Sequence, residues 1–261
     1  MSPINPPKSR PNNPINPTNP TNPKNPQPNK PNTLIIIGTV HLDIKASSRL
    51  IQLMETLRPT CVAVEISRFS VNFRKRHEQR WLKRFQELLE RLPEKRRCHF
   101  RIELLKRQLR MPFEWECATR YCSSCNIPCH PIDSGDLSRQ ELPWWDKELL
   151  RLDNLILATE EPDEDLDTYF QSHYQRAKMA LLKKNPSSNL VGGLVFDPHW
   201  CKRDEIISRR LMDLSKRHDR TVYIGGWMHL VDDGRSFSLG RLGRKLNSKM
   251  FLITGDECHK L

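Results

Sequence analysis

The stretch LIIIGTVH at residues 34–41 decides how the rest of the sequence is interpreted. Its run of four apolar residues is typical of a strand buried on both faces, as in a parallel sheet. A second apolar run, CVAVE at residues 61–65, follows a segment with helical spacing at residues 44–57. Strand, helix and strand so close together predict a right-handed parallel crossover.

The remaining periodic segments extend this pattern. Apolar runs predict three more strands, at residues 127–133, 221–226 and 251–254. Helical spacing covers four segments, at residues 69–110 with a break at Pro93, 113–126, 139–184 and 203–216, while GGLVF at 192–196 is ambiguous. We therefore expect an α/β fold: a mainly parallel central sheet flanked by helices, with a helical insertion after the second strand at about residues 69–126.

The first 32 residues are low in complexity, with five Asn-Pro pairs between residues 13 and 26. Proline fixes φ and removes amide donors, so residues 1–32 are predicted to be a disordered tail and residues 33–261 a single domain. Neither an 18-residue apolar run nor a signal sequence is present. We therefore expect a cytoplasmic protein without a transmembrane segment, whose eight cysteines are thiols.

The net charge of +12 is concentrated in residues 68–112, which carry 15 Lys/Arg and 5 Glu. Such a surface suits phosphate, nucleic acid or anionic lipid. No nucleic-acid-binding motif accompanies it, so we interpret it as a solvated helix face and expect no nucleic-acid partner.

Polar residues of catalytic type follow four of the predicted strands, namely His41, Glu65, Asp133 and His229. The carboxyl ends of parallel strands meet at one edge of a sheet, where ligands bind. Two imidazoles and a carboxylate suit a divalent metal such as Zn²⁺, Mn²⁺ or Fe²⁺, whose identity the sequence leaves open. The alternative is that these residues have structural roles. Each histidine, or Asp133, could cap a turn, and Glu65 could form an ion pair with Arg68 or Arg203.

Four cysteines and a histidine form another cluster, at Cys117, Cys122, Cys125, Cys129 and His130. The spacing is similar to that of some iron–sulfur proteins, and Cys122-x-x-Cys125 matches half of a zinc site. Because most of these residues fall in a predicted helix, we interpret them mainly as small apolar residues of its buried face.

The blocks around these residues resemble the TraB/PrgY family. The resemblance rests on LIIIGTVH at 34–41, RP at 58–59, VAVE at 62–65, the helix and Ile-Asp pair between 114 and 133, RD at 203–204, and IGGWMHL at 224–230. Both histidines share a Gly-x-x-His frame, after Gly38 and Gly226. The family belongs to one superfamily with the Tiki proteases, the erythromycin esterases and ChaN-like haem proteins, and TraB-type proteins are linked to shutdown of peptide pheromones.

The resemblance implies a metal-dependent hydrolase of a peptide or ester bond. In that interpretation His41, His229 and Glu65 hold the metal, and Glu65, Asp133 and Arg203 take part in catalysis. Substrate contacts are expected from Gly38, Gly226, Arg68 and His199. The alternative is a regulatory module that binds a peptide or haem on the same site without catalysis. One departure is Lys202, which stands where the family usually has Glu.

Overall fold

The computed structural model describes residues 32–182, 198–231, 239–246, 248–254 and 258–261. Residues 31–261 form one compact unit. Residues 1–31 of the predicted tail and the apolar segment at 192–196 lie outside the described residues. No helix among those described is long and apolar enough to cross a membrane.

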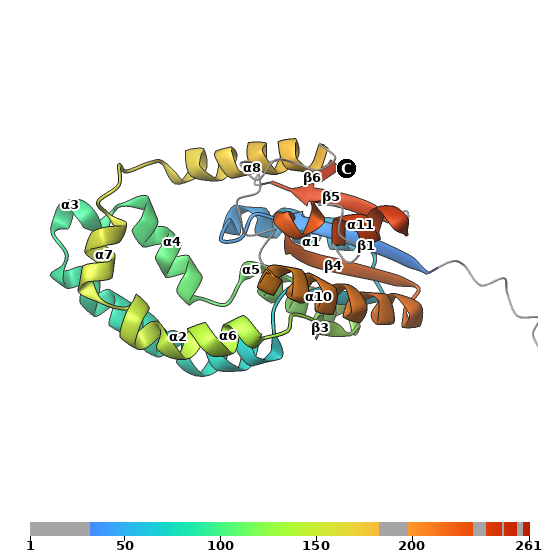
Figure 1. Ribbon diagram of the computed structural model, residues 1–261, viewed down its shortest axis with the longest axis horizontal. Helices are drawn as coiled ribbons and strands as arrows, with labels where there is room; N and C mark the ends of the chain where they lie inside the picture. The colour runs from blue at the N-terminus through green and yellow to red at the C-terminus, as the bar shows by residue number, and fades with distance from the viewer. Residues whose placement is uncertain (1–31, 183–197, 232–238, 247, 255–257) are drawn as a thin grey trace, which may run out of the picture. The chain divides into compact units, whose positions relative to one another are not determined.

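A six-stranded sheet forms the centre of the domain, in the order β3-β2-β4-β1-β5-β6 (Figure 1). The first five strands in sequence pair in parallel, and β6 pairs antiparallel with β5. Their bounds are β1 Thr33–Thr39, β2 Cys61–Val64, β3 Cys129–Pro131, β4 Arg220–Gly226, β5 Lys249–Ile253 and β6 Cys258–Lys260. The predicted α/β fold is therefore present, and of the described strands the sequence pattern missed the short β6.

Helices cover both faces of the sheet because the central strands are apolar on both sides. Ile35 and Ile37 of β1 pack with α1 (Ser47–Leu57) and α5 (Phe113–Cys125) on one face. On the other face, Ile36 belongs to the cluster formed with α8 (Leu166–Leu182), α10 (Pro198–Arg217) and α11 (Leu239–Lys245). Alternating side chains of a strand point to opposite faces, so one apolar run serves both clusters.

The basic segment after β2 forms helices that pack with those of residues 136–158 around a core of their own, in which the tilted rings of Trp81 and Trp145 are in contact. The main helices here are α2 Arg68–Arg91, α3 Glu94–Arg97, α4 Phe100–Leu109, α6 Asp136–Glu141 and α7 Leu152–Ala158. A break follows α2, as Pro93 predicts. Of the predicted insertion at 69–126, α5 packs on the sheet instead, since Phe113 and Cys117 lie in the core beside α1.

Candidate active site

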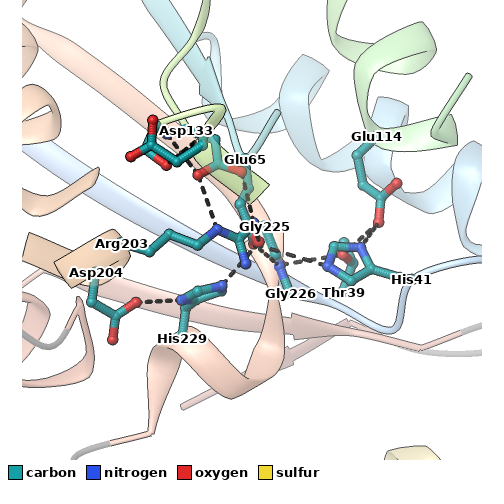
Figure 2. A network of polar contacts seen from close by, with 12 residues as sticks. Thr39, His41, Glu65, Glu114, Asp133, Arg203, Asp204, Gly225, Gly226 and His229 are labelled. Carbon is teal, nitrogen blue, oxygen red and sulfur yellow. Dashed lines mark hydrogen bonds and ion pairs between the residues drawn. The ribbon is translucent and has the colours of Figure 1, made fainter. Parts of the chain in front are cut away.

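Side chains from distant segments meet at the carboxyl edge of the sheet (Figure 2). His41 follows β1, Glu65 follows β2 and Asp133 follows β3, while His229 lies in the short helix η5 (Trp227–Leu230) after β4. Arg203 enters from the first half of α10. The four strand-end residues predicted to converge do so, and Arg203 links two of them.

Glu65 is the centre of this network, with a side chain only 2% exposed. Its Oε1 accepts from Arg203 Nη2 at 2.6 Å and from His229 Nε2 at 2.9 Å. Its Oε2 accepts from the Gly226 amide at 2.6 Å and from the Tyr223 hydroxyl at 3.3 Å. Burial alone would raise the pKa of Glu65, but His229 and Arg203 outweigh it and hold that pKa well below its usual range.

Two glycines let the backbone of β4 approach this carboxylate. A Cβ on Gly225 would overlap the Tyr223 hydroxyl and lie 2.6 Å from Glu65 Oε2. A Cβ on Gly226 would lie 2.6 Å from His41 Nε2. Only residues without a side chain fit at both places.

Arg203 is held by two carboxylates. Its Nε and Nη2 donate to the two oxygens of Asp133 at 2.9 and 2.8 Å, a bidentate pair, and Nη2 also donates to Glu65. Burial lowers the pKa of Arg203, but Glu65 and Asp133 overcome this and raise it above its ordinary value. The guanidinium is therefore a fixed, permanent positive charge beside Glu65.

His229 is 1% exposed and lies between two carboxylates. Nε2 contacts Glu65, and Nδ1 makes a short contact with Asp204 Oδ1. Because both partners are acceptors, both ring nitrogens donate, as in an imidazolium. Burial lowers the pKa of His229, but Glu65 and Asp204 raise it to about 9. The indole of Trp200 stacks on this ring, with centroids 4.3 Å apart and 6° between the planes.

His41 differs from His229 because its side chain is 48% exposed. Its Nδ1 lies 2.8 Å from Glu114 Oε1, which also accepts from the Thr39 hydroxyl at 2.9 Å. Nε2 lies 3.9 Å from Glu65 Oε2, beyond hydrogen-bond distance. Burial lowers the pKa of His41, whereas Glu114 and then Glu65 raise it, and the net shift is upward.

The backbone directly after His41 is strained. Leu42 has a φ of 69°, in the left-handed region that a branched side chain rarely adopts. Arg107 Nη1 donates to the Leu42 carbonyl at 3.0 Å and holds this turn. Such strain gathers at functional sites, and here it lies directly beside His41.

A cavity of about 710 Å³ opens beside these residues, a size typical of ligand sites. It lies between the sheet edge and the helices α2, α4 and α5, and is lined by His41, Glu65, Glu114, Asp133 and Arg203 among others. His229 is absent from the lining. The pocket therefore presents His41 to a ligand and keeps His229 behind Glu65.

The predicted metal set of His41, Glu65 and His229 does not fit a metal ion in this arrangement. Both nitrogens of His229 already donate, and each oxygen of Glu65 already accepts two hydrogen bonds. The Arg203 charge 2.6 Å from Glu65 would also oppose a bound cation. Within the described residues, three ligands whose donor atoms all lie within 4.8 Å of one another occur elsewhere, at Cys61, His130 and His218.

None of the four residues predicted to contact substrate lines the cavity. A Cβ on Gly38 would lie 2.9 Å from Leu230, so this glycine allows η5 to pack on β1. Arg68 and His199 are exposed at the starts of α2 and α10. Gly226 contributes its amide to Glu65 instead of lining the cavity.

The sequence did not assign a role to Glu114, Thr39, Asp204 or Tyr223. Glu114 lies in the first turn of α5, where an acidic residue is common for its effect on the helix dipole. Its side chain is buried, and Oε2 has no hydrogen-bond partner. The only available signal for Asp204 was its position next to Arg203.

The cysteine cluster is divided by the fold. Cys117 and Cys122 are buried in α5, as the helical interpretation predicted, and Cys125 is exposed at its end. Cys122 and Cys129 hydrogen-bond to each other, and this contact with burial raises the pKa of Cys129.

Comparison with protein-family models, curated proteins and solved structures finds no match for this chain. The resemblance to the TraB/PrgY family therefore stays a prediction.

Proposed function

We propose that this protein is a hydrolase of peptide or ester bonds in which His41 acts as general base. The pairing of His41 with Glu114 carries the proposal, because it combines an exposed imidazole with a buried carboxylate that fixes its orientation. The metal ion implied by the family resemblance has no part in this mechanism, since Glu65 and His229, two of its three expected ligands, are already bonded.

The hydrogen bond to Glu114 determines which ring nitrogen reacts. With Nδ1 donating to Glu114, Nε2 of neutral His41 is an acceptor. A water bound against Nε2 would lose its proton to the ring as its oxygen attacks the carbonyl carbon. Glu114 then stabilises the imidazolium, and the proton passes to the leaving oxygen or nitrogen as the tetrahedral intermediate collapses.

Positive charge for the developing oxyanion is available from Arg203, which lines the same cavity and is 20% exposed. Because Asp133 and Glu65 fix the guanidinium, it needs no reorganisation when negative charge develops. In this proposal Glu65 and His229 are positioning residues, because they are bonded to each other, Glu65 also to Arg203 and His229 also to Asp204.

The mouth of the cavity favours a substrate with negative charge. Lys106 and Arg110 line it and are exposed, with no ion pair to either among the described residues. By contrast, Arg107 is paired with Glu103 at 3.0 Å. An acidic peptide, or an ester with a carboxylate group, would meet these two charges on entry.

The test measures turnover directly. Chelator-treated protein is incubated with a panel of acyl esters and with a mixed peptide library, and products are identified by mass spectrometry. We expect hydrolysis that chelator leaves intact. Tight peptide binding without turnover would favour the regulatory binding module instead, and turnover only after metal addition would contradict the metal-free mechanism.

A further inference from the structure

A second cluster of reactive side chains lies at the other end of β2. Cys61 begins β2, four residues before Glu65, which is about 13 Å along a strand. His130 lies in β3, and His218 follows the last residue of α10. None of these side chains lines the cavity beside His41.

The strand register brings the three together. Ala63 of β2 pairs with His130, and Cys61 shares a sheet face with Ala63. Leu211 and Leu214 of α10 pack against that same face, so the end of the helix delivers His218 there. Cys61 Sγ and one ring nitrogen of each histidine all lie within 4.8 Å of one another.

Two further observations indicate that the cluster is built for a ligand. Nε2 of His130 is buried and has no hydrogen-bond partner, which is costly for a polar atom. The imidazole rings of His130 and His218 lie next to each other at the same cluster, with centroids 6.3 Å apart.

We propose that Cys61, His130 and His218 bind a zinc ion. One thiolate and two imidazoles are ligands that Zn²⁺ prefers, and a fourth tetrahedral position stays open to water. Donor atoms around a tetrahedral zinc lie about 3.5 Å apart, so small side-chain rotations would complete the site. The Cys61 thiol loses its proton to solvent as the Zn–S bond forms.

Two features of the surroundings determine how tightly the ion binds. The Cys61 thiol is buried and must lose its proton to bind zinc, so the affinity for zinc rises with pH. Arg217, next to His218, lies close enough to lower the pKa of both Cys61 and His130, and its charge opposes a cation. The bound ion would tie β2, β3 and α10 together at this edge.

The experiment uses the full chain, purified without a histidine tag, reduced and freed of metal. Zinc is titrated in competition with a chromophoric chelator, and Co²⁺ is used to detect thiolate-to-metal absorption. We expect one equivalent of zinc per chain, a rise in the melting temperature, and thiolate absorption with Co²⁺.

The variants C61S and H218Q should weaken zinc binding by roughly 100-fold or more, and C61S should lose the thiolate absorption. R217Q should bind zinc a few-fold tighter, because it removes a like charge. The control C125S, at an exposed cysteine, should behave as wild type. Because His218 is only partly buried, we expect H218Q to fold, and it tests the zinc site if C61S fails to fold. Less than half an equivalent of zinc, or unchanged affinity in H218Q, would overturn the proposal.

Discussion

The imidazole of His229 and the carboxylate of Glu65 are joined by a 2.9 Å contact from which solvent is excluded, with side chains 1% and 2% exposed. Each also binds a second ion-pair partner, Asp204 for His229 and Arg203 for Glu65. This relationship explains why the two histidines of the repeated Gly-x-x-His frame differ. His229 is bonded within the buried network, whereas the exposed ring of His41 remains available to a ligand.

The first prediction concerns the stability of this network. Replacing Arg203 by Met removes the charge that faces Glu65 and Asp133, and leaves two buried carboxylates short of a partner. Urea unfolding should show a loss of about 3–5 kcal/mol. The matched control is R209M, one turn and a half along α10, where the ion pair with Glu205 is exposed and the loss should stay within about 0.5 kcal/mol. Equal losses in both variants would contradict this account.

The second prediction concerns the pH dependence of stability. The folded pKa of His229, about 9, exceeds the ordinary value of 6.5. A raised pKa stabilises the fold fully below 6.5, and this stabilisation is lost as pH rises through about 9. The shift corresponds to a loss on the order of 3 kcal/mol, at about 1.4 kcal/mol per pKa unit. Measured by urea unfolding, the difference in stability between wild type and H229Q should therefore shrink over this range. A difference that does not change with pH would show that His229 is not charged in the fold.

The third prediction concerns Glu114. In E114Q the orienting carboxylate becomes an amide, so kcat should fall roughly tenfold or more. Because Glu114 raises the pKa of His41, the acid limb of the pH–rate profile should also move to lower pH. The control E87Q alters an exposed glutamate of α2 and should change neither. A lower kcat with an unmoved acid limb would indicate a merely structural role for Glu114.

The fourth prediction concerns the mouth of the cavity. Reversing the charge in K106E or R110E should raise KM for an anionic substrate about three- to tenfold and leave kcat nearly unchanged, since each exposed charge contributes up to about 1 kcal/mol. The effect should diminish at high salt. K95E, on α3 and outside the cavity lining, is the control. Identical KM values for anionic and neutral substrates in the wild type would contradict the assignment of this mouth.

The sheet could be predicted from the sequence because β1, β2 and β4 each contain an unbroken run of apolar residues, and such runs have few alternatives to a buried parallel strand. The same reasoning predicted that the strand-end residues lie close together, because the carboxyl ends of parallel strands lie at one edge of the sheet. These residues are His41, Glu65, Asp133 and His229. Residues on helices could not be placed in this way. Glu114 approaches His41 only because α5 packs across β1 and β2, and no local pattern records that packing.

The metal hypothesis shows a second limit of the sequence. A sequence displays potential donors, but it does not show which of their lone pairs and protons are already engaged. In the fold, Asp204 bonds the second nitrogen of His229 and Arg203 lies against Glu65. Likewise Cys61, His130 and His218 are far apart in the chain, and the β2–β3 register with the end of α10 brings them together.

The central claim, that His41 is the base, is tested most directly by comparing kcat/KM of wild type and H41Q on the best ester or peptide substrate, with folding of each checked by circular dichroism. The control is H173Q, at a histidine of α8 outside the cavity lining. We predict that H41Q loses about 10²- to 10⁴-fold while H173Q matches the wild type. An H41Q protein that is folded and hydrolyses the substrate at the wild-type rate would contradict the account.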